Sequence, residues 1–305
     1  MKVRIGVGVS GDVAGPNPRA GGLGAVVDAL ADLRFDSIWL PEILTASTPD
    51  PAVALAWAAA RTPKLKLGTT CLVPGRNVIR LAKSLATLDA LSEGRLLLTF
   101  VPGLAVAPER AAIGPEPKVR GALIDEALPL LRRLWAGEEV SHHGAVGDFD
   151  GVRLAPLPLQ QPLEPWLGGM APEALRRCGE LADGWLPALC TPEEAAAGRE
   201  VIDRAAAAAG RSIDPEHFGV SVGYATAPLS DAALAALARR SRGHDPAELV
   251  PVGHAALRAT LEAFVAVGFT KFVLRPTGQP GDWVEELKAL AEGVLDLQTG
   301  GSKPG

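Results

Sequence analysis

Short apolar segments alternate with longer amphipathic segments along most of the chain. The apolar segments are continuous runs of β-branched residues or leucine, which is typical of strands that are buried on both faces. Eight segments have this character: Val3–Val9, Ser37–Leu40, Leu65–Val73, Arg95–Val101, Pro165–Leu167, Trp185–Ala188, Phe218–Tyr224 and Thr270–Arg275. Because each of them precedes a helix-like segment, the pattern predicts an α/β fold, namely a (β/α)8 TIM barrel.

Local signals fix several of the expected helices. Asn77 predicts an N-cap for a helix over Val78–Leu91, whose apolar positions share one face. Pro129 lies inside the helical pattern of Arg120–Trp135, so we expect that helix to be kinked or to start late.

Two stretches interrupt the alternation. Pro102–Lys118 follows the fourth expected strand and is rich in proline and glycine. Gly137–Glu164 precedes the fifth, contains the solvated pair His142-His143, and is typical of an excursion with a hairpin. We therefore expect insertions after strand 4 and before strand 5 of a single barrel domain over residues 1–298, with residues 299–305 as a flexible tail.

Composition narrows the possible functions. The chain has 305 residues, of which 48% are hydrophobic and 21% charged, which is enough to bury a sizeable core. The net charge of −5 and the absence of basic runs interleaved with aromatics argue against a nucleic-acid partner. No apolar run approaches the ~18 residues of a membrane span, and no signal peptide is present, so we expect a cytoplasmic protein without a membrane partner.

The expected strand ends lack the residues of several common barrel chemistries. No lysine stands where a Schiff base would form, and no cluster of histidines and carboxylates is placed to bind a metal. Gly6–Gly11 satisfies G-x-G-x-x-G, but prolines follow it and a helix can begin only near Leu23, which favours a barrel strand and a mobile loop over a dinucleotide site. The C-terminal ends of the strands form the mouth of the barrel, and a mouth that lacks these groups indicates that a bound cofactor carries the chemistry.

Two segments could hold such a cofactor. Gly68–Asn77 ends the third strand with small and hydroxyl residues. In Leu167–Glu173, Gly168 and Gly169 precede a helix N-terminus, where exposed N–H groups suit a phosphate. A tight strand-to-helix turn explains the same glycines, so both interpretations remain open at this point.

From roughly Val3 to Leu297, the chain resembles the bacterial luciferase-like superfamily of flavin- and F420-dependent oxidoreductases. The matching segments follow the family's order and include Phe35–Glu42, Leu67–Thr69, Leu85–Leu96, Gly168-Gly169 and Ala182–Trp185, of which Leu85–Leu96 is the most specific. The resemblance implies a (β/α)8 barrel with insertions, a cofactor at its C-terminal mouth, a small-molecule substrate and a homodimer.

The resemblance also assigns site residues. It places the cofactor ring at the end of the third strand, a phosphate at the turn after the fifth, and an acidic residue beside the ring. The positions are Thr69, Thr70 and Cys71 for the ring, Gly168, Gly169 and Met170 for the phosphate, and Glu42 for the acid. In relatives a non-proline cis peptide backs the ring, and here it would join Thr70 to Cys71.

One departure limits what the resemblance implies about catalysis. Many F420 enzymes of this class have a histidine proton donor where this chain has Ile43. Glu42 is then the only positioned acid or base, and it either transfers a proton or only binds the cofactor. A composition rich in alanine, arginine and glycine favours coenzyme F420 and hydride transfer to or from an organic substrate. An FMN-dependent monooxygenase and a non-catalytic cofactor-binding barrel remain alternatives.

Overall fold

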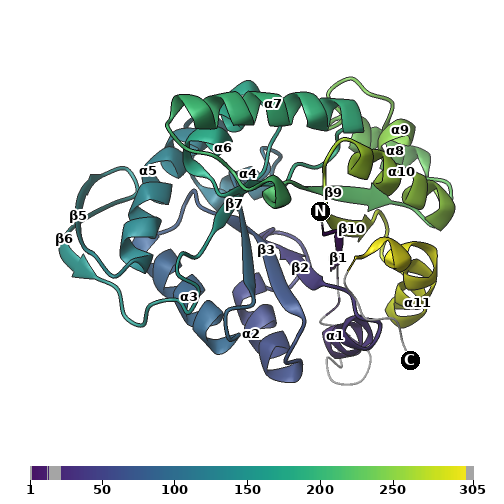
Figure 1. Cartoon of the computed structure of the whole chain (residues 1–305), viewed down its shortest axis with the longest axis horizontal. Coiled ribbons are helices and arrows are strands. Elements are labelled where there is room, and N and C mark those ends of the chain that lie inside the picture. Colours follow the sequence, from purple (N-terminus) through teal and green to yellow (C-terminus); the bar gives the residue numbers. More distant parts are fainter. Residues whose placement is uncertain (1, 12, 14–21, 300–305) are drawn as a thin grey trace.

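The computed structural model describes residues 2–11, 13 and 22–299, and its centre is a barrel of parallel strands (Figure 1). The eight strands hydrogen-bond in the order β8-β7-β4-β3-β2-β1-β10-β9. Two bridges, Trp185 to Phe218 and Ala188 to Ser221, join the outer strands and bring the barrel close to closure. The predicted (β/α)8 barrel is confirmed.

All eight predicted strands are present, with ends shifted by a few residues. Their bounds are β1 Arg4–Gly8, β2 Ser37–Pro41, β3 Lys66–Leu72, β4 Leu96–Val101, β7 Pro165–Leu167, β8 Gly184–Trp185, β9 Gly219–Tyr224 and β10 Lys271–Pro276. The main hydrophobic core lies between their outer faces and the surrounding helices, because each strand presents alternate side chains to that layer.

The helices surround the barrel (Figure 1). Their bounds are α1 Leu23–Asp32, α2 Pro51–Arg61, α3 Val78–Leu91, α4 Glu109–Ile113, α5 Pro117–Trp135, α6 Pro172–Leu181, α7 Pro192–Ala208, α8 Asp231–Ala238, α9 Pro246–Leu249, α10 His254–Ala266 and α11 Trp283–Val294. The predicted N-cap of α3 is confirmed, since the Asn77 side chain accepts a hydrogen bond from the backbone N–H of Arg80.

The expectation of a late start for α5 was wrong. This helix begins at Pro117 and continues through Pro129 to Trp135. Pro117 stands in the first turn, where its fixed φ and missing N–H suit a helix. A buried apolar face that includes Leu128 and Leu131 compensates for the hydrogen bond that Pro129 cannot donate.

The hairpin expected before the fifth barrel strand is present as β5 Glu139–Gly144 and β6 Gly147–Arg153, which pair antiparallel beside α5 (Figure 1). His142 lies on β5, not in a loop, and its Nε2 is 2.7 Å from a carboxylate oxygen of Glu126.

The predicted tail begins later than expected. Thr299 is held in place, because its N–H donates to the Val3 carbonyl at 3.2 Å and its hydroxyl accepts from the Val3 N–H at 2.8 Å. The rest of the predicted tail, residues 300–305, and most of the mobile loop expected after β1 lie outside the described residues.

A separate apolar cluster fills the inside of the barrel. Trp39, Leu186 and Val273 are its buried members, with Leu97 and Trp166 packed against them. A Cβ at Gly68 would overlap the Trp39 ring, so glycine at this position of β3 gives the indole its space.

Candidate functional site

The end of β3 presents alternate side chains to the two faces of the barrel wall. Gly68 faces Trp39 inside the barrel, so the alternation also turns Thr70 inward and turns Thr69 and Cys71 toward the helices. Of the three residues predicted to contact a cofactor ring, only Thr70 therefore has its side chain on the interior face.

Cys71 is buried in the outer core, at 3% exposure. Burial raises the pKa of its thiol well above the usual value, and the nearby Glu42 carboxylate raises it further. The thiol is thus held in its neutral form, which suits a packing residue and not a nucleophile.

Glu42 follows β2 directly and connects that strand to the end of β3. One carboxylate oxygen accepts a hydrogen bond from the Leu72 N–H at 2.7 Å, and the other accepts from the Arg76 guanidinium. The backbone N–H of Glu42 also donates to the Thr70 carbonyl at 2.9 Å. Only 2% of the Glu42 side chain is exposed, so the carboxylate fixes the strand end and does not project freely into the mouth.

The predicted cis peptide between Thr70 and Cys71 was wrong. The cis bonds of the described chain all precede proline: Ala107–Pro108, Ala155–Pro156 and Gln161–Pro162. Parallel pairing of β3 with β4 continues in register to its last residue, which places Leu72 opposite Val101. Because this regular ladder reaches the end of the strand, no bulge remains there for a cis bond to occupy.

The predicted phosphate residues Gly168, Gly169 and Met170 line a cavity of about 530 Å³ between α5 and α6. Gly169 has a φ of 104°, a conformation that favours glycine, and a Cβ there would lie 3.1 Å from the Ala174 Cβ. The Trp185 indole donates to the Gly169 carbonyl at 2.9 Å and so fixes the orientation of the turn.

The cavity lining carries three basic side chains, Lys118, Arg176 and Arg177, and two acidic ones, Asp125 and Glu173. No side chain caps the N-terminus of α6, which leaves its positive dipole end and the Glu173 N–H for a ligand, since Pro172 has no N–H and those of Ala174 and Leu175 donate to the Ala171 carbonyl. Lys118 lines the cavity and makes no ion pair with a described residue. Arg177 also lines it and bonds Asp125 at 3.1 Å. A glycine turn, a helix N-terminus and a lysine together fit a phosphate group.

Arg275 is a candidate that the sequence reasoning missed. It stands near the end of β10 on the interior face, where a Cβ at Gly8 would overlap it. Within the described part of the chain, its only hydrogen bond runs from Nε to the Ser221 hydroxyl at 2.9 Å. Burial lowers the pKa of this guanidinium to about 10. A half-buried guanidinium without a carboxylate partner is suited to bind an anionic group. The available signal was a charged residue within an apolar strand.

Glu109 is a second residue that the sequence analysis missed, and it connects two segments at the C-terminal mouth of the barrel. It is 2% exposed, and its two oxygens accept from the backbone N–H groups of Leu44 at 3.0 Å and Thr45 at 2.9 Å. Burial alone would raise the pKa of Glu109, but these hydrogen bonds hold it below its usual value. The loop after β2 is therefore joined to α4, in the stretch that follows β4.

Arg120 holds the segment between β4 and α5 in place through backbone carbonyls. It is 1% exposed and donates to the carbonyls of Pro115, Pro102, Leu104 and Arg110 at 2.8 to 3.2 Å. The segment that follows β4 is therefore an ordered part of the C-terminal mouth of the barrel and not a loose loop.

Among the residues that the structure describes, no group of three or more histidine, cysteine or acidic side chains is placed to bind a metal. None of their helices is long and apolar enough to cross a membrane.

Comparison with known proteins places these features in context. The family model described as "Luciferase-like monooxygenase" matches residues 3–296 of the chain. An F420-dependent glucose-6-phosphate dehydrogenase from Kineococcus radiotolerans is 28% identical over 290 residues, which cover 80% of this chain and 84% of that protein. An F420-dependent secondary alcohol dehydrogenase in complex with an F420-acetone adduct has a TM-score of 0.80 at 20% identity, covering 98% of this chain and 100% of that one. The oxygenating constituent of 3,6-diketocamphane monooxygenase from Pseudomonas putida, in complex with FMN, has a TM-score of 0.73 at 18% identity, covering 96% of this chain and 98% of that one.

Proposed function

Since the chain belongs to the luciferase-like monooxygenase family, we propose that it is an oxidoreductase that uses coenzyme F420. The observation that carries the proposal is the cavity beside Gly169, which combines a glycine turn, the N-terminus of α6 and Lys118. The F420-dependent relative supports F420 over FMN, because its similarity extends over most of both chains.

The residues of the chain have distinct roles in this proposal. The turn at Gly169 binds the cofactor phosphate, and Thr70 presents its side chain toward the ring. Glu42 fixes the strand end behind that ring through Leu72. The deazaflavin, when bound, supplies or accepts the hydride. The barrel orients the reactants and excludes water from them.

Arg275 suggests which kind of substrate enters. Its guanidinium lies on the interior face of the barrel with only a hydroxyl as partner among the described residues, so a substrate with an anionic or strongly polar group would satisfy it. The substrate panel should therefore include sugar phosphates and carboxylates beside simple secondary alcohols.

The cofactor is tested by titrating the purified protein separately with F420 and with FMN while following cofactor fluorescence. We expect F420 to bind more tightly and its absorbance to change when a substrate from the panel is added. Tighter FMN binding with substrate-dependent oxygen consumption would support the flavin monooxygenase instead. F420 binding without turnover across a broad panel would favour a non-catalytic barrel.

We also propose that the protein is a homodimer. Exposed apolar side chains lie on α2 and at the end of α3: Val53 is 72% exposed, Trp57 38% and Leu91 65%. Their burial against a second copy would remove this apolar surface from water. Light scattering after size exclusion should give twice the chain mass, and Trp57→Glu should shift it toward the monomer.

A further inference from the structure

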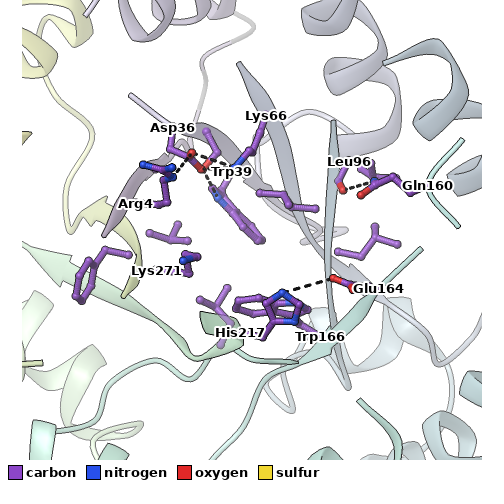
Figure 2. A pocket seen from close by; sticks show the side chains of 17 residues that line it. Arg4, Asp36, Trp39, Lys66, Leu96, Gln160, Glu164, Trp166, His217 and Lys271 are labelled. Atoms are coloured by element: carbon purple, nitrogen blue, oxygen red, sulfur yellow. Dashed lines mark hydrogen bonds and ion pairs between the residues drawn. The ribbon is translucent and has the colours of Figure 1, made fainter. Parts of the chain in front are cut away.

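A second cavity lies at the opposite end of the barrel from the proposed cofactor site, with a volume of about 180 Å³ (Figure 2). Arg4, Lys66 and Lys271, which line it, are the first residues of β1, β3 and β10. Parallel strands of a barrel all begin at the same end, so this cavity opens at the N-terminal mouth. The cofactor residues described above stand at the strand ends and do not line it.

The wall of the cavity is apolar and aromatic. Trp39 and Trp166 line it with Leu97, Leu186 and Val273 (Figure 2). Leu97 and Trp166 are only partly buried, so apolar surface inside the cavity is open to solvent. An apolar cavity of about 150 Å³ in another protein holds benzene, so the size here fits one aromatic ring.

The rim of the cavity carries more positive than negative groups. Arg4 and Lys66 share a single carboxylate, because their nitrogens lie 3.5 Å and 3.1 Å from the same Asp36 oxygen. Lys271 donates to the Lys2 carbonyl at 3.0 Å, and its carboxylate partner, Glu216, lies 3.5 Å away and outside the cavity lining. Three basic side chains therefore meet two acids on this side, Asp36 in the cavity lining and Glu216 outside it.

The opposite side of the rim carries one carboxylate and one imidazole. Glu164 lies 3.7 Å from the His217 ring, which packs against Trp166 at a centroid distance of 5.4 Å. Burial raises the pKa of Glu164 above its usual value. Negative charge is thus favoured at the lysine side, while the aromatic side accepts a ring.

We propose that the N-terminal mouth of the barrel binds a small aromatic carboxylate. The ring lies against Trp39 and Trp166, and the carboxylate bonds Lys271. An organic cation of the same size would meet the three basic side chains and is disfavoured. A small inorganic anion would leave the apolar wall exposed to water and lacks the hydrophobic contribution to binding. This proposal does not depend on the identity of the cofactor.

The test uses three probes: benzoate, which has both groups, benzyl alcohol, which has the ring without the charge, and acetate, which has the charge without the ring. Calorimetric titration of the whole protein should show benzoate binding about ten-fold or more tighter than either other probe, the ratio expected for one charge-assisted hydrogen bond. Equal affinities for benzoate and benzyl alcohol would contradict the role of the rim.

Two further measurements locate the binding. Lys271→Met should weaken benzoate binding about ten-fold, whereas Lys288→Met, which removes an exposed lysine on α11, should leave it unchanged. Thermal unfolding checks that both variants are folded. If Lys271→Met does not fold, Lys271→Gln takes its place, since the amide removes the charge and can still donate to the Lys2 carbonyl.

Benzoate binding should also be the same with and without saturating F420 or FMN. Competition with either cofactor would place benzoate at the other mouth and overturn the proposal. The absence of any benzoate binding to the wild-type protein would overturn it as well.

Discussion

The carboxylate of Glu42 accepts a hydrogen bond from the backbone N–H of Leu72 at 2.7 Å, and this bond joins the first residue after β2 to the last residue of β3. The same carboxylate accepts from Arg76. Both oxygens of the acid expected beside the cofactor are therefore already engaged within the protein.

Glu42→Gln should reduce stability and leave proton transfer intact. The amide oxygen still accepts from Leu72, but the ion pair with Arg76 is lost, so the free energy of unfolding should fall by about 1–2 kcal/mol. Glu138→Gln, which breaks the exposed pair with Arg133, serves as the control and should change stability by less than ~0.5 kcal/mol. Turnover that falls while cofactor affinity stays constant would instead identify Glu42 as a proton donor.

Gly169→Val should weaken cofactor binding at least ten-fold, or ~1.4 kcal/mol, because a side chain blocks close approach of the backbone to the phosphate. Gly243→Val is a matched control. Gly243 also has a positive φ, 95°, but nothing lies within 4 Å of its added Cβ. The control should share the backbone strain without the loss of binding. Unchanged cofactor affinity in folded Gly169→Val would remove this turn from the site.

Arg275→Gln should stabilise the protein and impair its reaction. The change removes a half-buried charge that has no carboxylate partner among the described residues, which should add about 1 kcal/mol to the free energy of unfolding. It should also lower kcat/KM for an anionic substrate at least ten-fold, the loss expected for one charge-assisted hydrogen bond. Equal kcat/KM values for wild type and variant would show that the guanidinium does not contact substrate.

Glu109→Gln should alter the dependence of stability on pH. The folded-state pKa of Glu109 lies below its usual value of 4.5, so its carboxylate adds stability above pH 4.5 and loses that contribution as the pH falls. At pH 7 the free energy of unfolding of the variant should be about 1–3 kcal/mol lower. The glutamine amide has a single oxygen, so it can accept from the N–H of Leu44 or of Thr45 but leaves the other without its acceptor. Unfolding scans at pH 7, 5 and 3 should show the gap to wild type closing. A gap that stays constant would contradict the assignment.

The three cysteines should be unreactive in the folded protein. Cys71, Cys178 and Cys190 are buried and free. Burial raises the pKa of all three thiols, that of Cys190 to about 12. A thiol reagent at pH 8 should label none of them before unfolding and all of them afterwards. Cys71→Ala should retain turnover, and loss of turnover with the fold intact would show a role in the reaction.

The barrel was predictable because its information is local. Continuous apolar runs such as Phe218–Tyr224 mark strands buried on both faces, and Asn77 marks a helix start by itself. The course of α5 was predicted less well. Proline is a strong local signal against a helix, and packing of the apolar face overrides it at Pro129.

The site was only partly predictable because its geometry depends on distant partners. The glycines of the phosphate turn carry their own signal, since few residues adopt the φ of Gly169. Glu109 carries none, because its partner Thr45 lies 64 positions earlier in the chain. The direction of Cys71 follows from strand alternation, but only once Gly68 is known to face the interior.

Trp39, which occupies the barrel interior beside Gly68, affects how small molecules can enter and leave the barrel. Trp39, Leu186 and Val273 are each at most 6% exposed, so these three side chains close the barrel interior between its two mouths. In the proposed reaction, substrate and product would then both use the C-terminal mouth, and a product would leave before the next substrate enters. The same three side chains would keep solvent that arrives from the N-terminal end away from a reduced cofactor.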